Sequence, residues 1–165
     1  MVVKLKKIGF YALICLVIDQ LIKLVVSFLD LNTKITIIPN FFYITYVQND
    51  GAAWSILSGN RLLLIMIGII CLFLVYFFLI RNKQISKFEQ VNYVLLVSGI
   101  MGNLCDRIIR GYVIDYLDFK IFNYYFPIFN LADIFIVIGT GLIIISLFKG
   151  EKDGKNSSNG KPREN

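Results

Sequence analysis

Four long apolar runs constrain the fold of this chain more than any other feature of its sequence. They cover residues 8–28, 62–80, 91–108 and 131–148 and are separated by short polar stretches. A helix needs about 20 mostly apolar residues to cross a hydrocarbon core of about 30 Å. Because 57% of the 165 residues are hydrophobic and only 17% are charged, little sequence remains for a soluble domain. We therefore predict an all-α membrane protein with four transmembrane helices, forming one integral membrane domain over residues 1–165.

The basic residues predict how these helices are oriented. They gather before the first run, between the second and third runs, and after the fourth: Lys4, Lys6 and Lys7; Arg81, Lys83 and Lys87; Lys149, Lys152, Lys155, Lys161 and Arg163. By the positive-inside rule, both termini and the middle loop are cytoplasmic, and residues 150–165 form a polar, disordered cytoplasmic tail. The formal charge of +6 does not indicate a nucleic-acid partner, because these lysines do not form one face with aromatic residues between them.

The two segments on the opposite side of the membrane differ in character. Residues 30–60 combine turn-forming residues with β-favouring runs at 35–38 and 41–47, which predicts a small extracytoplasmic β element. Residues 109–129 are mixed, and they contain a cluster of aromatic residues, Phe122, Tyr124, Tyr125, Phe126 and Phe129. Aromatic side chains favour the headgroup interface. A hypothesis follows, that this cluster and residues 49–54 flank or cover a cleft.

The first apolar run resembles a signal peptide in its position but not in its details. The polar group Asp19, Gln20 and Lys23 interrupts it, and no small-residue cleavage pattern follows. We therefore expect a retained first helix. The cysteines Cys15 and Cys71, like the third one at position 105, show no metal or redox spacing and are interpreted as apolar filler.

The absence of histidine limits the chemistry that is open to this chain. The sequence contains no histidine, so it excludes serine–histidine and cysteine–histidine catalysis and the H-E-x-x-H metalloprotease pattern. A serine–lysine dyad stays open in principle, with Lys23 as the base and Ser27 or Ser98 as the nucleophile, although neither serine lies in a recognisable nucleophile motif.

Polar residues inside the apolar runs gather toward one side of the predicted membrane. Asp19 and Lys23 share a face of the first helix, since they are four residues apart. Gly99, Asn103 and Arg107 share a face of the third helix for the same reason. Charged groups are costly in lipid and commonly mark a functional site. We expect these two faces to oppose each other across a polar cleft.

Two further acids are placed where the third and fourth helices emerge. Asp115 lies in the segment that returns to the membrane, and Asp133 lies in the first turn of the fourth helix. Two close carboxyl groups cannot both ionise readily, so one keeps a proton and polarises a carbonyl while the other activates water. Such a pair titrates as a unit.

Each of these acids also has a purely structural interpretation. Asn130-x-x-Asp133 is typical of a helix N-cap with an acidic residue that favours the helix dipole. Asp115 and Asp118 could each be a solvated loop acid. Asp106 could form an ion pair with Arg107 at the end of the third helix. Asp19 could pair with Lys23 within the first helix, with the lysine side chain reaching outward to the interface.

Five ordered motifs carry a resemblance to a known family. They are Asp19-Gln20-x-x-Lys23, Asn49-x-Gly51-Ala52-Ala53-Trp54, Gly102-Asn103-x-x-Asp106-Arg107, Gly111-x-Val113-x-Asp115 and Phe126-Pro127-x-Phe129-Asn130-x-Ala132-Asp133. Together they resemble bacterial lipoprotein signal peptidase, also called signal peptidase II. The resemblance spans the first to the fourth helix. It departs mildly at Gln48, Ser98 and Ile100, positions that affect the shape of the cleft and not the acids.

The resemblance implies a membrane aspartic endopeptidase. It would remove the signal peptide from diacylglyceryl-modified prolipoproteins, cutting before the lipidated cysteine by water that the catalytic residues Asp115 and Asp133 activate. The resemblance also implies a set of residues that bind the substrate or support the site. They come from the family pattern and from neighbouring motif positions: Asp19, Lys23, Asn49, Gly51, Ala52, Gly99, Asn103, Arg107, Asn130 and Ala132.

The same resemblance sets expectations for partners and location. We expect no metal and no cofactor, and as partners the lipid-modified signal peptide and membrane lipid, with a monomer in the bacterial cytoplasmic membrane and an active site toward the extracytoplasmic side. Two other classes stay open. A proton-linked carrier would use Asp19, Asp115 and Asp133 as a relay but commonly shows two similar halves, and none is visible here. A non-enzymatic assembly factor would leave the ordered motifs unexplained.

Overall fold

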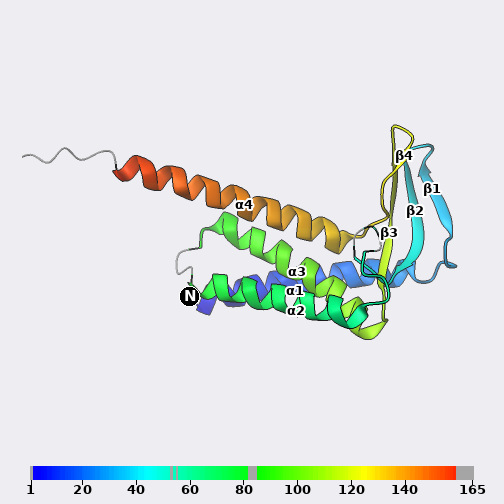
Figure 1. Cartoon of the computed structure of the whole chain (residues 1–165), viewed down its shortest axis with the longest axis horizontal. Helices are drawn as coiled ribbons and strands as arrows, with labels where there is room; N and C mark the ends of the chain where they lie inside the picture. The colour runs from blue at the N-terminus through cyan, green and yellow to red at the C-terminus, as the bar shows by residue number, and fades with distance from the viewer. Residues whose placement is uncertain (1, 53, 55, 82–84, 159–165) are drawn as a thin grey trace, which may run out of the picture.

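A helical bundle with a small sheet at one end makes up the described part of the chain. The computed structural model describes residues 2–52, 54, 56–81 and 85–158, with side chains from residue 5 to residue 148 except at position 80. Within this part the elements are α1 (Val2–Val26), β1 (Lys34–Ile38), β2 (Phe42–Asn49), α2 (Arg61–Arg81), α3 (Lys87–Ile109), β3 (Val113–Ile121), β4 (Tyr124–Tyr125) and α4 (Leu131–Ser158). Helix α3 is central, because it packs against each of the other three helices (Figure 1).

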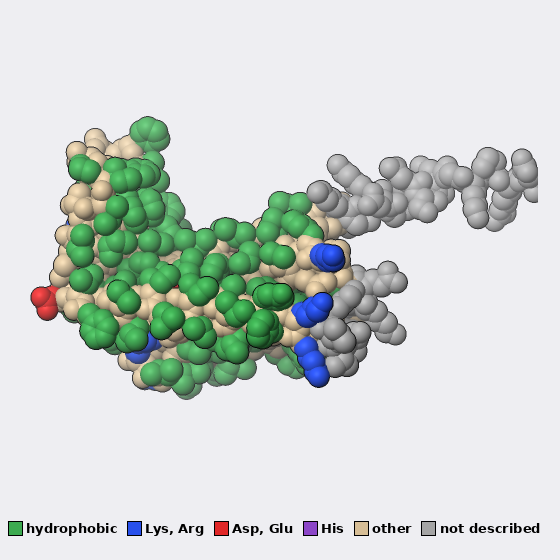
Figure 2. Space-filling model, turned by 180° about the vertical axis from the view of Figure 1, so that it is seen from behind, with side chains coloured by type: hydrophobic (Ala, Val, Ile, Leu, Met, Phe, Trp, Pro, Cys, Tyr) green, Lys and Arg blue, Asp and Glu red, His purple; other side chains and the backbone are tan. Residues whose placement is uncertain are grey.

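Three of the helices in the described part are long and apolar enough to cross a membrane. These spans are Leu5–Val26, Arg61–Leu79 and Leu131–Phe148. Apolar side chains cover most of the face of the bundle that Figure 2 shows. Leu62 is 70% exposed and Val137 is also 70% exposed. An apolar surface of this extent indicates lipid and not water as its surroundings.

Helix α3, like α1, buries polar side chains inside the bundle. Asn92, Asn103 and Asp106 are all buried on it. The helix begins at a capping box, in which Ser86 accepts the backbone N–H of Glu89 and the Glu89 carboxylate accepts the N–H of Ser86.

The end of α4 differs from the prediction. The helix continues to Ser158, so the first part of the predicted disordered tail, 150–165, is helical. An established helix elongates easily, since each further residue adds a hydrogen bond without a new nucleation step. Residues 159–165, and with them Lys161 and Arg163, lie outside the described residues, as does Lys83. The side chains of Lys4, Lys149, Lys152 and Lys155 lie outside the described side chains.

The sheet is larger than the predicted β element. Its four antiparallel strands run in the order β1-β2-β3-β4, and β3 and β4 come from the segment 109–129. The prediction missed these strands because Asp115 and Asp118 interrupt the apolar pattern of β3. The sheet stands across the end of the bundle, where α1 and α3 end and α2 and α4 begin (Figure 1).

A small apolar core fixes β3 over the end of α1. Val26 of α1 packs with Tyr46 of β2 and with Ile114 and Tyr116 of β3, and all four side chains are buried. Gly111 makes the turn from α3 into β3 with φ +92°, a conformation that glycine adopts without strain. This turn and this core place Asp115 next to the helix ends.

Candidate active site

The first turn of α4 begins with a cap made by two residues of the candidate site. The Asn130 side-chain oxygen accepts the backbone N–H of Asp133 at 3.0 Å, and the Asp133 carboxylate accepts the backbone N–H of Asn130 at 3.1 Å. The predicted N-cap is therefore present. It does not exclude a chemical role, because the other carboxylate oxygen of Asp133 accepts a hydrogen bond from the Asn103 side-chain amide at 2.7 Å.

The two remaining free N–H groups of this turn also find side-chain acceptors. The N–H of Leu131 donates to the Tyr116 hydroxyl at 3.3 Å, and the N–H of Ala132 donates to Asp19 at 3.1 Å. Burial raises the pKa of Tyr116 to about 12, so its hydroxyl stays neutral. Strand β3 and helix α1 thereby hold the end of α4 that carries Asp133.

Asp115 lies in strand β3 and not in a loop. Its side chain is 3% exposed, so the interpretation as a solvated loop acid is wrong. One carboxylate oxygen accepts from the Asn49 amide at 2.8 Å, and the other accepts from the Asn130 amide at 2.6 Å. Burial, followed by the nearby charge of Asp133, raises the pKa of Asp115 from its ordinary 3.8 to about 7. A carboxyl with this pKa can hold or release a proton near neutral pH.

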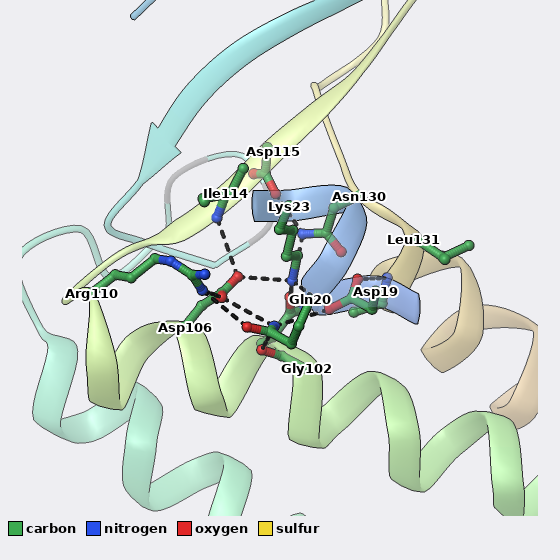
Figure 3. Close-up of polar contacts among 12 residues, drawn as sticks. Asp19, Gln20, Lys23, Gly102, Asp106, Arg110, Ile114, Asp115, Asn130 and Leu131 are labelled. Carbon is green, nitrogen blue, oxygen red and sulfur yellow. Dashed lines mark hydrogen bonds and ion pairs between the residues drawn. The ribbon is translucent and has the colours of Figure 1, made fainter. Parts of the chain in front are cut away.

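A buried ionic cluster of Asp19, Lys23, Asp106 and Arg110 lies beneath Asp115 (Figure 3). The Lys23 ammonium is within 3.0 Å of Asp19 and 2.8 Å of Asp106, and all three side chains are fully buried. Asp106 also pairs with Arg110, and Gln20 donates to Asp106 at 3.2 Å. The cluster therefore joins α1 to α3 through two cations and two carboxylates.

Two structural interpretations of these residues are wrong. Lys23 does not reach outward, because its side chain is 0% exposed. Asp106 pairs with Lys23 and Arg110 instead of Arg107, since adjacent residues on a helix point in different directions. Arg110 and Gln20 were not among the predicted site residues, although the spacing of Asp106 and Arg110, four residues apart, was a signal that pointed to their pairing.

Arg107 holds the segment that follows β2. Its guanidinium donates to the carbonyl of Gly51 at 2.7 Å and to the carbonyl of Asn103 at 3.3 Å. Asn49 accepts the N–H of Gly51 at 2.9 Å, and its amide contacts the carbonyl of Ala52 at 3.5 Å. These bonds join Asn49, which touches Asp115, to the end of α3.

Small residues allow the three helices to approach closely at the site. A Cβ atom at Gly99 would lie 2.4 Å from the carbonyl oxygen of Ala132, and a Cβ atom at Gly102 would lie 2.6 Å from the Asp19 carboxylate. Neither contact is possible for a side chain. The distance between α3 and α4, and with it the contact of Asn103 with Asp133, depends on glycine at these positions.

The two acids line the same cavity, of about 1050 Å³, between α2, α3 and α4. Asn49, Ala52, Asn103 and Arg107 line it beside them, and most of the remaining lining is apolar. Trp54, Phe126 and Phe129 also line this cavity, in agreement with the hypothesis that their segments flank a cleft. Apolar residues on the three helices extend the cavity away from the sheet, among them Ile67, Leu74, Phe78, Leu96 and Leu147.

Asp118 is separate from this site. It is 4% exposed, pairs with Lys34 at 2.7 Å and accepts from the Thr45 hydroxyl at 3.2 Å, so the interpretation as a solvated acid is wrong. Strand alternation places it on the face of β3 opposite to Asp115, three residues away.

The described contacts do not support the other chemistries. Ser27 donates to the carbonyl of Leu24, and Ser98 donates to the carbonyl of Leu95, while Lys23 is bound to acids and an amide. Among the described residues, no group of three or more cysteine, aspartate or glutamate side chains could hold a metal ion.

Comparisons with known proteins agree with the resemblance. The family model described as signal peptidase (SPase) II matches residues 11–149. A lipoprotein signal peptidase of Staphylococcus aureus is 40% identical over 146 residues, which covers 88% of this chain and 90% of that protein. The lipoprotein signal peptidase of Staphylococcus aureus strain Newman is 41% identical over 145 residues, with coverage of 87% and 89%.

Two solved structures share the fold. Both are described as bacterial membrane enzymes solved by the in meso method. The first gives a TM-score of 0.81 at 38% identity over 97% of this chain and 94% of that one. The second gives 0.78 at 39% identity, with coverage of 87% and 94%. The fold is thus that of a membrane enzyme, with apolar helices and a small antiparallel sheet, and the chain belongs to the signal peptidase II family of peptidases.

Proposed function

We propose that this chain is an aspartic endopeptidase that removes the signal peptide from diacylglyceryl-modified prolipoproteins. It cuts before the lipidated cysteine, and Asp115 and Asp133 activate the attacking water. The observation that carries the proposal is the position of these two carboxylates at the polar end of one long, mostly apolar cavity. Such a cavity suits an apolar signal segment, while the polar end suits the peptide bond to be cut.

The surroundings of the two acids favour a division of roles. Asp133 lies at the N-terminus of α4, where the helix dipole favours an anion, and its carboxylate accepts two hydrogen bonds. We assign it the role of general base. Asp115 has a pKa raised to about 7 and is the residue that keeps a proton near neutral pH. We assign it the role of general acid.

The reaction then proceeds without a covalent enzyme intermediate. Asp133 takes a proton from water as the water oxygen bonds to the peptide carbonyl carbon, and Asp115 gives its proton to the carbonyl oxygen. The resulting gem-diol collapses when the proton returns to Asp115 and Asp133 protonates the departing nitrogen. Both acids regain their starting states. The amides of Asn49, Asn103 and Asn130 keep the carboxylates oriented throughout.

The proposed membrane placement follows from the charge distribution. Figure 2 shows Lys and Arg side chains at both ends of the bundle, and the sequence places most of them before residue 8, between residues 80 and 91 and after residue 148, which is the end opposite the sheet. The chain starts at that same end, and α4 ends there (Figure 1). Under the positive-inside rule this end is cytoplasmic, and the sheet and the two acids face the extracytoplasmic side of the bacterial cytoplasmic membrane. We propose that all four helices cross the bilayer and that a monomer of one integral domain acts on its substrate among membrane lipids.

A cleavage assay in phospholipid nanodiscs tests this function. The wild-type protein should cut a lipidated prolipoprotein and leave the unlipidated precursor intact. Asp115→Asn and Asp133→Asn should each lower kcat by about 100-fold to 10 000-fold, the usual contribution of a general acid or base. Asp118→Asn is the matched control, because this buried acid lies on the same strand but outside the cavity.

Three results would contradict the proposal. Cleavage at the wild-type rate by a folded Asp115→Asn or Asp133→Asn variant would remove the two-aspartate mechanism. Equal cleavage of lipidated and unlipidated precursor would remove the substrate assignment. A chelator should leave the rate unchanged, and inhibition that added zinc reverses would contradict metal-free chemistry.

A further inference from the structure

We propose that Lys23 is a positioning residue that fixes the orientation of the Asn103 side-chain amide and thereby directs its N–H group at Asp133. The inference rests on the proposed role of Asp133 as the general base. Lys23 contacts neither acid of the pair and does not line the cavity. Its charge acts on Asp115 through space and lowers the pKa of that carboxyl, whereas its direct contact toward Asp133 is the hydrogen bond to Asn103.

The ammonium of Lys23 has a partner for each of its three N–H groups. Asp19 lies 3.0 Å away and Asp106 lies 2.8 Å away, and the third contact, at 3.1 Å, is the side-chain oxygen of Asn103. The two carboxylates suffice to neutralise the lysine charge and to join α1 to α3. The third contact is different because it leads toward the candidate active site.

The contact with Lys23 favours one of the two orientations of the Asn103 amide. The oxygen and nitrogen of an amide are nearly equal in size, so packing alone does not distinguish the two orientations. The Asn103 oxygen accepts from Lys23 and, at 3.3 Å, from the Asn130 amide, so the Asn103 nitrogen must face Asp133, which it reaches at 2.7 Å. The reversed amide would turn its N–H₂ group toward the cation and its oxygen toward the carboxylate. Both contacts would be repulsive.

The position of the cluster makes this selection strong. Lys23, Asp19 and Asp106 are 0% exposed, and Asn103 is 7% exposed, so water does not compete for these groups. Charge-assisted hydrogen bonds are about twice as strong as those between neutral groups. Removal of the lysine charge should therefore weaken the preference of the Asn103 amide for the orientation that supports the base, which the contacts with Asn130 and Asp133 would then maintain alone.

A simple substitution of Lys23 would leave two buried carboxylates with insufficient countercharge and would endanger folding. We therefore choose the pair Asp19→Asn with Lys23→Met. It removes one charge of each sign and leaves the Asp106–Arg110 pair in place. The amide oxygen of the new side chain at position 19 can still accept the N–H of Ala132, so the α4 cap is kept. Asp19→Asn alone, which keeps the lysine, is the reference.

The matched control removes an ion pair outside the site. Lys34→Met with Asp118→Asn deletes one charge of each sign, from β1 and from the face of β3 opposite to Asp115. Thermal unfolding in detergent, followed with a thiol-reactive dye, checks the fold of every variant. The control should keep the kcat of the wild type.

Cleavage kinetics give the first readout. Relative to Asp19→Asn, the D19N/K23M variant should lose about 100-fold in kcat, the size expected for a misoriented catalytic contact, with little change in KM. In a background of Asp19→Asn with Asn103→Leu, addition of Lys23→Met should have almost no further effect on kcat, because two residues that act through one contact are not additive. Equal kcat values for D19N and D19N/K23M would overturn the proposal. So would a loss of kcat from Lys23→Met that is as large with Asn103→Leu as without it.

A second readout does not depend on activity. With ¹⁵N-labelled asparagine, the side-chain amide signal of Asn103 is identified by its absence in Asn103→Leu. Its hydrogen exchange should be slow in D19N and at least about tenfold faster in D19N/K23M, because the amide then reorients. Unchanged exchange would overturn the inference. If the wild type failed to cleave lipidated precursor, the proposed function would fail while this measurement would still decide the role of Lys23 in orienting the amide.

Discussion

The side-chain amide of Asn130 donates a 2.6 Å hydrogen bond to the carboxylate of Asp115. This bond joins the residue before α4 to the middle of the sheet. The oxygen of the same amide caps the first turn of α4 by accepting the N–H of Asp133. One buried side chain thus has two separable roles, a cap for the helix and a donor to the candidate acid.

Asn130→Ser should separate these two roles. Serine is a good N-cap, so the variant should lose only about 1 kcal/mol of stability. It has no amide donor for Asp115, so the cleavage rate should fall by about tenfold or more through the lost orientation. Thermal unfolding and kcat, measured on the same preparation, check both statements. A variant that unfolds early but cleaves normally would show that Asn130 acts as a cap only.

The activity should depend on pH through Asp115. Burial and the charge of Asp133 raise its pKa from 3.8 to about 7, so the proton that the general acid needs is lost as pH rises above about 7. The rate constant kcat should fall on that side. A pH profile of kcat in nanodiscs checks this, and a flat profile from pH 6 to pH 9 would contradict the role of Asp115 as the acid.

The same shift predicts how stability changes with pH. Between pH 3.8 and about 7 the folded protein holds a proton on Asp115 that the unfolded chain has released. Stability therefore decreases as pH rises through this range and levels off above it. Asp115→Asn should remove this part of the decrease. Melting temperatures of the wild type and the variant, compared across the range, test the sign.

Gly99 and Gly141 offer a matched pair of glycine substitutions. A Cβ at Gly99 would lie 2.4 Å from the Ala132 carbonyl, whereas a Cβ at Gly141 meets nothing within 4 Å. Gly99→Ala should push α3 away from α4, lower the melting temperature and weaken the contact of Asn103 with Asp133. Gly141→Ala should stabilise the protein by up to about 1 kcal/mol through helix propensity. A harmless Gly99→Ala would contradict the close approach of these helices.

Arg61 should stabilise the end of α3. Its side chain donates to the carbonyl of Arg107 at 2.7 Å and to the carbonyl of Ile108 at 2.8 Å. Carbonyl groups in the last turn of a helix have no partner within the helix itself. Arg61→Gln should cost about 1 kcal/mol, because one side chain serves both carbonyls in an exposed position. Among the contacts that the structure describes, Arg81→Gln at the other end of α2 removes the one with the Phe77 ring, and it should cost less. Thermal unfolding of both variants gives the comparison, and equal losses would contradict the capping role.

The helices could be predicted from the sequence because the apolar runs are a local signal. The sheet was only partly predictable, since β3 buries Asp115 and Asp118 and its acids hide the alternation of a strand. Asp118 is buried because Lys34, from a distant strand, neutralises it. No local pattern carries that information.

In the candidate site, too, local motifs could be predicted and contacts between distant residues could not. The N-cap of Asn130 with Asp133 is a local motif and was predicted, and the spacing of Asp19 and Lys23 correctly placed them on one face. The pairing of Lys23 with Asp106 joins residues 83 positions apart in sequence and depends on the packing of α1 against α3. The close approach at Gly99 is likewise a property of packing and not of sequence spacing.

The ionic cluster also bears on how the chain enters the bilayer. Asp19 and Lys23 form an i, i+4 pair within α1, and Asp106 forms one with Arg110, the C-cap of α3. Each helix therefore carries its own countercharge when it leaves the translocon, before it has met its neighbour. The contact of Lys23 with Asp106 forms only when the two inserted helices associate, so insertion and assembly can be successive steps. A substitution that removes one partner would leave an unbalanced charge already at the insertion step, before any packing is lost.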